Sequence, residues 1–143
     1  MAAVLSLLRG THLLTLVGAG GVGKTRMALE VADHVVAEFT DGVCIVELAT
    51  VSDAFLVIGT VAGALDVYDE VAQPLRDTLL EFLRRRRMLL ILDSCEHLIE
   101  ACAAFAEQAA LQRRHEHIGD QPQGARRCGR GRMAPAIVAI SSA

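Results

Sequence analysis

Aromatic residues are scarce in this sequence of 143 residues, which contains no tryptophan, one tyrosine and four phenylalanines. Hydrophobic residues still make up 52% of the sequence, so a chain of this length can bury a core. That core must consist mainly of valine, leucine, isoleucine and alanine, which is typical of parallel sheets covered by helices. The composition therefore favours one α/β domain.

Cysteine pairs and membrane-spanning stretches are also absent. The four cysteines are Cys44, Cys95, Cys102 and Cys128. They form no C-x-x-C pair and no metal-ligand spacing, which favours a reduced protein in the cytoplasm. No apolar stretch is long enough to cross a bilayer, and the apolar start, with Arg9 after it, lacks the order of a signal peptide. We therefore expect a soluble, cytoplasmic protein with no membrane partner.

Three short apolar runs predict strands that are buried on both faces, at residues 13–17, 43–46 and 88–92. Apolar residues at helical spacing, with capping signals, predict helices at residues 24–39, 53–65, 74–85 and 96–112. Helices that alternate with strands are typical of a three-layer α/β fold whose sheet is mainly parallel.

The alternation stops after Leu111, and the charge balance changes at the same point. Residues 1–111 carry eight basic and fifteen acidic side chains, whereas residues 112–143 carry six arginines and two acids. Only residues 137–140 have the apolar character of a strand in this second part. We therefore expect residues 1–111 to form a partial nucleotide-binding domain, for the reasons that follow, and residues 112–143 to be an irregular basic tail.

The segment from residue 18 to residue 25 fits the phosphate-binding pattern G-x-x-x-x-G-K-[ST], directly after a predicted strand and directly before a predicted helix. Glycines allow backbone N–H groups to turn toward phosphates, and the helix N-terminus adds partial positive charge. Lys24 is expected to reach the β- and γ-phosphates, and the Thr25 hydroxyl to bind Mg²⁺. The predicted nucleotide-binding residues are Gly18, Ala19, Gly20, Gly21, Val22, Gly23, Lys24 and Thr25. The sequence thus predicts a P-loop NTPase sheet that binds ATP or ADP with Mg²⁺.

Two acidic residues follow the third apolar run. Asp93 stands where a phosphate-loop fold places the carboxylate that organises Mg²⁺, so Thr25 and Asp93 are the predicted metal ligands. Glu96 is a second candidate catalytic residue, placed to orient a water; the alternative is a first-turn acid that complements a helix dipole. His97 is more typical of a polar surface or packing residue than of a base.

A dinucleotide site is the main rival, because Gly18, Gly20 and Gly23 also fit G-x-G-x-x-G and Glu47 ends the second predicted strand. The lysine and threonine directly after Gly23 favour a triphosphate with Mg²⁺, since a dinucleotide fold does not require them.

Arginines at residues 84–87 raise the question of nucleic-acid binding. They lie at the predicted C-terminus of a helix, where cations offset the helix dipole, and no aromatic residue is interleaved with them. We therefore expect no direct nucleic-acid contact here. Arg26 is expected on the surface of its helix, close to the phosphates.

Three blocks of sequence carry a more specific resemblance: GAGGVGKTRMALEVA, CIVELATVSDAFLV and RRRRMLLILDSCEHLIEACAAFAE. In this order and spacing they resemble the nucleotide-binding domain of bacterial signal-transduction ATPases of the NB-ARC/STAND type, which occur in LuxR-type and related transcriptional regulators. The resemblance covers residues 13–111 and implies that residues 18–25 bind phosphates and that Asp93 organises Mg²⁺. Ser94 departs from the Asn or Asp that the family often has at this position.

Parts of that family pattern are missing. Its members continue into a fourth strand with a Thr-Ser-Arg sensor and then into further domains, so this chain is expected to be truncated at both ends. Because the sensor arginine is absent, we expect weak or no ATP hydrolysis. A small phosphotransferase or nucleotide kinase is the alternative, although residues 48–80 supply only Arg76 for the arginine-rich lid that such an enzyme needs.

A further alternative is a non-functional remnant of a frameshifted gene. Residues from about Arg114 onward are predicted to be out of frame. With suitable synonymous codons, a reading one base later yields an apolar strand followed by Thr-Ser-Arg, and Met133-Ala134 forces a tryptophan in that frame. This prediction implies a sheet that lacks its genuine fourth strand, the one that carries the Thr-Ser-Arg sensor in the family.

Overall fold

The computed structural model describes residues 2–10, 13–19, 21–119 and 136–142. The helices are α1 (Ala2–Gly10), α2 (Lys24–Val35), α3 (Leu56–Ala64), α4 (Leu75–Arg84) and α5 (Ile99–Gly119), with a 3-10 turn η1 (Val36–Glu38) after α2. The strands are β1 (Leu13–Gly18), β2 (Val43–Glu47), β3 (Leu89–Asp93) and β4 (Ala136–Ser142). Among the described residues, no helix is both long enough and apolar enough to cross a membrane.

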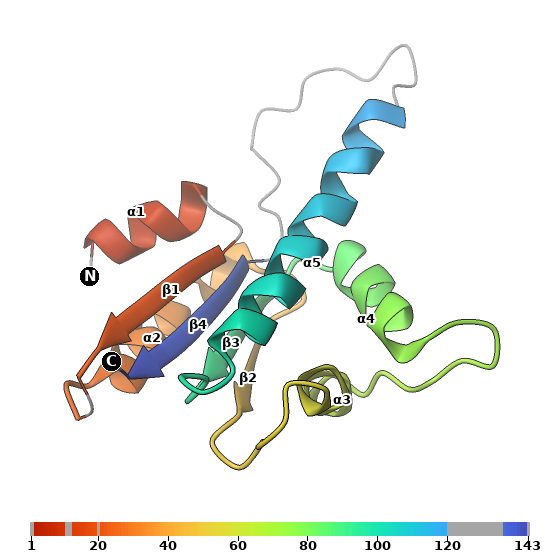
Figure 1. Ribbon diagram of the computed structural model, residues 1–143. Helices are drawn as coiled ribbons and strands as arrows, with labels where there is room; N and C mark the ends of the chain where they lie inside the picture. The colour runs from red at the N-terminus through yellow and green to blue at the C-terminus, as the bar shows by residue number, and fades with distance from the viewer. Residues whose placement is uncertain (1, 11–12, 20, 120–135, 143) are drawn as a thin grey trace, which may run out of the picture.

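All four strands run parallel in one sheet, in the order β1-β4-β3-β2 (Figure 1). The register pairs Gly18 with Ser142 and Glu47 with Asp93, so the carboxyl ends of the strands meet at one edge. In open parallel sheets, ligands bind outside this carboxyl edge.

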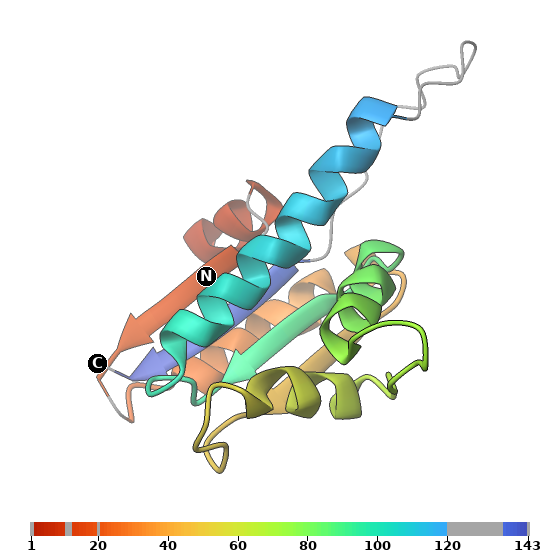
Figure 2. The same ribbon diagram turned by 45° about the vertical axis from the view of Figure 1, so that its right-hand side comes forward.

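Helices cover both faces of the sheet, as the alternating pattern predicts. Leu89 and Ile91 of β3 pack into a core shared with α1 and α2, whereas Leu90 and Leu92 pack into a core shared with α3, α4 and α5. Figure 2 shows α5 along the near face of the sheet and α2 behind the strands. Because successive side chains of a strand point to opposite faces, a strand buried on both sides must be apolar throughout. The three-layer α/β fold is confirmed.

The first helix, α1, is not among the helices that the sequence analysis predicts. Leu8 is only 1% exposed and belongs to the same cluster of buried residues as Val35 and Phe39. Arg9 at the end of α1 donates to Glu38, with 2.6 Å between Nη2 and Oε1. A nine-residue helix is marginal alone in water, so packing against α2 stabilises it.

The second half of the chain departs from the expected tail in two places. Helix α5 runs past residue 111 to Gly119, and Ala136–Ser142 forms β4 between β1 and β3. The prediction of a strand at residues 137–140 is confirmed, because this apolar segment of the tail supplies a fourth strand to the sheet. The neighbouring strands β1 and β3 supply hydrogen-bond partners for the backbone of this short apolar segment. The local composition of the segment does not reveal these partners. Residues 120–135 lie outside the described residues, and the reading frame stays a prediction.

Candidate functional site

The glycine-rich loop joins β1 to α2 at the carboxyl edge of the sheet. Gly21 and Gly23 have φ angles of 79° and 80°, in the left-handed region where a Cβ is strained. Gly23 caps α2 without a side-chain hydrogen bond, and its carbonyl accepts from the N–H of Met27 at 2.8 Å. The first N–H groups of α2 thus have no side-chain cap, and this helix end favours an anion. Gly20 lies outside the described residues.

Lys24 bends back over this loop. Its half-buried ammonium donates to the carbonyl oxygens of Gly18, at 2.9 Å, and Ala19, at 2.7 Å. Both acceptors belong to the predicted phosphate-binding segment. The ammonium of Lys24 therefore lies at the mouth of the loop.

Thr25 and Asp93, which are 68 residues apart in sequence, meet at this edge. The Thr25 hydroxyl lies 3.0 Å and 3.2 Å from the two carboxylate oxygens of Asp93. Asp93 is only 6% exposed, and its Oδ1 also accepts from the Ser94 N–H at 2.8 Å. A hydroxyl beside a carboxylate forms a set of hard oxygen donors, the kind that Mg²⁺ prefers together with phosphate oxygens. The residues present fit the predicted metal ion.

A hollow of about 360 Å³ lies between this loop and the end of β3. It is lined by Gly21, Gly23, Lys24, Thr25, Arg26, Asp93, Ser94 and Glu96. Glu96 lies in the turn before α5, which begins at Ile99. Glu96 is therefore not an acid in the first turn of that helix, which was the alternative to a role at the site. Within the described part of the chain, no three His, Cys, Asp or Glu side chains cluster as a metal site.

Ser94 has a structural role that sequence reasoning missed. Its φ of 59° is left-handed, a conformation that costs a residue with a Cβ about 1 kcal/mol or more. This conformation accompanies the Ser94 N–H bond to the Asp93 carboxylate. Asn and Asp tolerate this region better than serine does, so the residue type gave no local signal for this conformation.

The strand order removes the support for a dinucleotide site. Glu47 is exposed at the end of β2, and two strands, β3 and β4, separate β2 from β1. Three strand spacings amount to about 14 Å. In a dinucleotide-binding fold the strand that carries the ribose-binding acid is the direct neighbour of β1. Glu47 is therefore too far from the glycine loop for that role.

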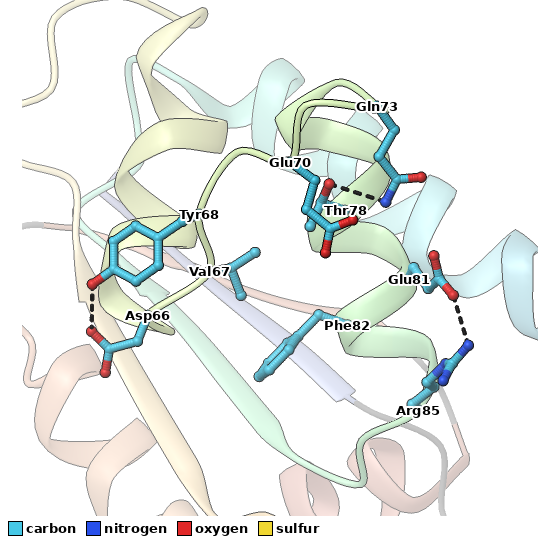
Figure 3. Close-up of a pocket in the computed structure, with 9 residues that line it drawn as sticks. All are labelled: Asp66, Val67, Tyr68, Glu70, Gln73, Thr78, Glu81, Phe82 and Arg85. Atoms are coloured by element: carbon cyan, nitrogen blue, oxygen red, sulfur yellow. Dashed lines mark hydrogen bonds and ion pairs between the residues drawn. The ribbon is translucent and has the colours of Figure 1, made fainter.

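A second hollow, of about 450 Å³, lies between α4 and the segment that joins α3 to α4 (Figure 3). Its polar side chains are largely occupied by one another, as in the contacts between Tyr68 and Asp66 and between Arg85 and Glu81. It is larger than the hollow at the glycine loop, but neither the loop nor Asp93 lines it. Chemistry rather than size therefore favours the glycine loop as the nucleotide site.

The arginines at residues 84–87 are engaged within the domain. Arg85 pairs with Glu81 at 2.8 Å, and Arg86 contacts Asp41 at 3.4 Å while stacking over the Phe82 ring at 4.6 Å. Arg26 pairs with Glu30 at 3.1 Å on the surface of α2, as expected. The ion pairs of the arginines were not predicted, and the expectation of no nucleic-acid contact here stays a prediction.

Asp41 makes the stability of this region depend on pH. The backbone N–H of Arg87, at 2.7 Å, and the Arg86 guanidinium lower the pKa of Asp41. A lowered folded-state pKa stabilises the fold above the unfolded pKa of about 3.9, and this contribution is lost as pH falls through the folded value. We expect Asp41→Asn to lower the urea midpoint between pH 5 and 8. The difference from the wild type should shrink below about pH 4, and a difference that stays constant down to the acid limit would contradict this assignment.

Comparison with curated proteins identifies mycobacterial relatives. A Mycobacterium tuberculosis protein, provisionally named as an HTH-type transcriptional regulator, is 44% identical over 100 residues, which are 70% of this chain and 11% of that protein. A Mycobacterium bovis protein of the same description gives the same values. An uncharacterised Mycobacterium tuberculosis protein is 40% identical over 101 residues, which are 71% of this chain and 26% of that protein. The chain thus spans only a small part of the length of these relatives.

Solved structures share the fold. The ORC2 protein of Aeropyrum pernix, determined as ADPNP-ADP complexes, superposes with a TM-score of 0.59 at 13% identity, covering 99% of this chain and 40% of that one. Cdc6p of Pyrobaculum aerophilum gives a TM-score of 0.62 at 17% identity, covering 99% and 37%. At such identities the likeness concerns the fold alone.

The family assignment agrees with both the loop geometry and the sheet. The NB-ARC domain family matches residues 2–109, a range that includes α1, the glycine loop and Asp93. This chain belongs to the NB-ARC family of nucleotide-binding domains.

Proposed function

We propose that this domain binds ATP or ADP with Mg²⁺ and serves as the nucleotide-dependent switch of a bacterial transcriptional regulator of the LuxR-related type. The observation that carries the proposal is the Thr25 hydroxyl against the Asp93 carboxylate, at 3.0 Å, beside the Lys24 ammonium. A hydroxyl, a carboxylate and an ammonium at one helix N-terminus match the needs of a metal-bound triphosphate.

Each residue has a role in this proposal. Residues 18–25 surround the phosphates with backbone N–H groups, and Lys24 exchanges its loop carbonyls for phosphate oxygens. Thr25 and Asp93 hold the metal, while Glu96 at the rim orients water. When bound, Mg²⁺ neutralises phosphate charge.

The regulatory part of the proposal draws on the relatives. Two of them are provisionally named as HTH-type transcriptional regulators, and residues 13–111 resemble the ATPase domain of such proteins. A switch acts by binding its two nucleotide states with different affinities in two arrangements. DNA contact is assigned to other parts of such regulators, since Arg84 and Arg85 pair with Glu81 and Arg86 pairs with Asp41.

A labelling experiment tests nucleotide binding directly. Lys24 is the only lysine in the sequence, so an amine-reactive reagent has a single side-chain target. At ten times the dissociation constant, Mg-ADP should slow modification of Lys24 by about tenfold, because the bound fraction exceeds nine tenths. The N-terminal amine serves as the internal control. Protection by NADH and none by ATP or ADP would reject the proposal.

Asp93→Asn tests the metal site, since it preserves the shape of the side chain and removes its charge. We expect the gain in ADP affinity caused by Mg²⁺ to fall by about tenfold, while metal-free binding changes little. Phosphate release from ATP should be near background in both proteins, because Arg26, the one arginine among the described residues of the hollow, is paired with Glu30. Rapid release by the wild type that Asp93→Asn abolishes would contradict the expectation of weak turnover.

A further inference from the structure

His97 makes a contact that joins two distant turns. Its Nε2 lies 2.5 Å from the carbonyl oxygen of Val51, 46 residues earlier in the chain. A carbonyl oxygen only accepts hydrogen bonds, so Nε2 carries the hydrogen and donates. This nitrogen is thus committed to the backbone, and His97 is not among the residues that line the nucleotide hollow.

The two turns leave neighbouring strands at the same edge. The first follows β2 and is closed by a bond from the Val51 N–H to the Leu48 carbonyl, at 3.1 Å. The second follows β3 and is closed by a bond from the Leu98 N–H to the Cys95 carbonyl, at 2.9 Å. All four of these residues are buried in one core cluster.

A second bond completes a closed ring of contacts between the turns. The Leu48 N–H donates to the Asp93 carbonyl at 2.9 Å, one residue beyond the paired strands. The turn after β2 is therefore joined at two points, to the end of β3 through Leu48 and Asp93, and to the turn after β3 through Val51 and His97. A turn held at only one point is free to pivot about it, whereas two points fix its orientation.

Asp93 at the end of β3, with Ser94 and Glu96 directly after it, lines one side of the nucleotide hollow. We propose that His97 is a positioning residue, which ties the turn after β3 to the turn after β2 and so holds the Asp93 and Glu96 carboxylates toward a metal-bound nucleotide. This inference rests on the proposed function for its last step, but the tether itself is a property of the nucleotide-free fold. If the tether already orders this turn in the free protein, nucleotide binding does not have to supply the conformational entropy that ordering the turn costs.

Three variants distinguish the effect of the His97 hydrogen-bond donor from the effect of its aromatic ring. His97→Ala removes both, His97→Phe keeps a ring without a donor, and His97→Gln keeps an N–H donor. His34→Ala is the matched control, because His34 also contacts a carbonyl, that of Glu30 at 2.6 Å, within α2. Amide hydrogen exchange of Leu48, Val51 and Leu98 is measured without nucleotide, and the dissociation constant of Mg-ADP by calorimetry.

The alanine and phenylalanine variants should exchange these three amides about two- to tenfold faster and bind Mg-ADP weaker by a similar factor. His97→Gln should stay within about twofold of the wild type, and His34→Ala should change neither readout. Unchanged exchange in both the alanine and phenylalanine variants overturns the tether. Faster exchange with unchanged Mg-ADP affinity overturns the positioning role. A wild type that binds no Mg-ADP overturns the proposed function, and the positioning role with it, even where the exchange results confirm the tether.

Discussion

Lys24→Ala is expected to abolish most of the stabilisation that Mg-ATP or Mg-ADP confers on this domain. A ligand at 100 times its dissociation constant stabilises the folded state by about 2.7 kcal/mol, which for a chain of this size raises Tm by roughly 10 °C. Lys24 supplies the ammonium at the mouth of the loop, and a charged hydrogen bond to phosphate is among the strongest contacts available there. Thermal unfolding with and without nucleotide measures the loss.

Arg26→Ala is the matched control for Lys24→Ala. Arg26 is also basic and also lines the hollow, but its side chain is 85% exposed and pairs with Glu30. Its removal should alter the nucleotide-induced shift by no more than about 0.5 kcal/mol. Equal losses in the two variants would mean that general positive charge, and not the Lys24 position, attracts the nucleotide.

Leu8→Ala is expected to destabilise the domain by about 2–5 kcal/mol, a large part of the 5–15 kcal/mol that folded domains possess. Leu8 is 1% exposed in the core that α1 shares with α2, so truncation leaves a cavity against Val35 and Phe39. Urea unfolding at neutral pH measures the effect, and the slope of the transition should stay constant.

The adjacent Leu7 offers a control in the same helix turn. Leu7 is 52% exposed, so Leu7→Ala should cost about 0.5 kcal/mol or less. Equal effects of the two substitutions would show that α1 contributes through helix formation alone and not through its contact with α2.

Several features follow from the sequence alone because their physics is local. The glycine loop needs Gly21 and Gly23 for left-handed φ angles, and the helix that begins at Lys24 follows directly. The buried strand β3 is apolar at every position before Asp93, so the run of leucine and isoleucine predicts it within one residue. Local signals of this kind, within about ten residues, suffice for the predicted α/β class and for the candidate loop.

The placement of elements that are distant in the sequence depended on the tertiary structure. Helix α1 has a short apolar pattern, and only its burial against α2 distinguishes it from a frayed terminus. Strand β4 lies between β1 and β3 and pairs with both. This pairing stabilises the strand, although the sequence before it shows no regular pattern. The Arg86 contact with Asp41 likewise joins residues that no periodicity connects.

The same distinction applies at the candidate site. Residues 18–25 predict a phosphate loop by themselves, and Asp93 is recognisable as the acid that ends an apolar strand. The strand order separates Glu47 from the loop, and the turns after β2 and β3 bring His97 to Val51. The His97 contact with Val51 joins residues that are 46 positions apart, and the Thr25 contact with Asp93 joins residues that are 68 apart. Their geometry therefore depends on the whole sheet and its two helical layers rather than on any local pattern.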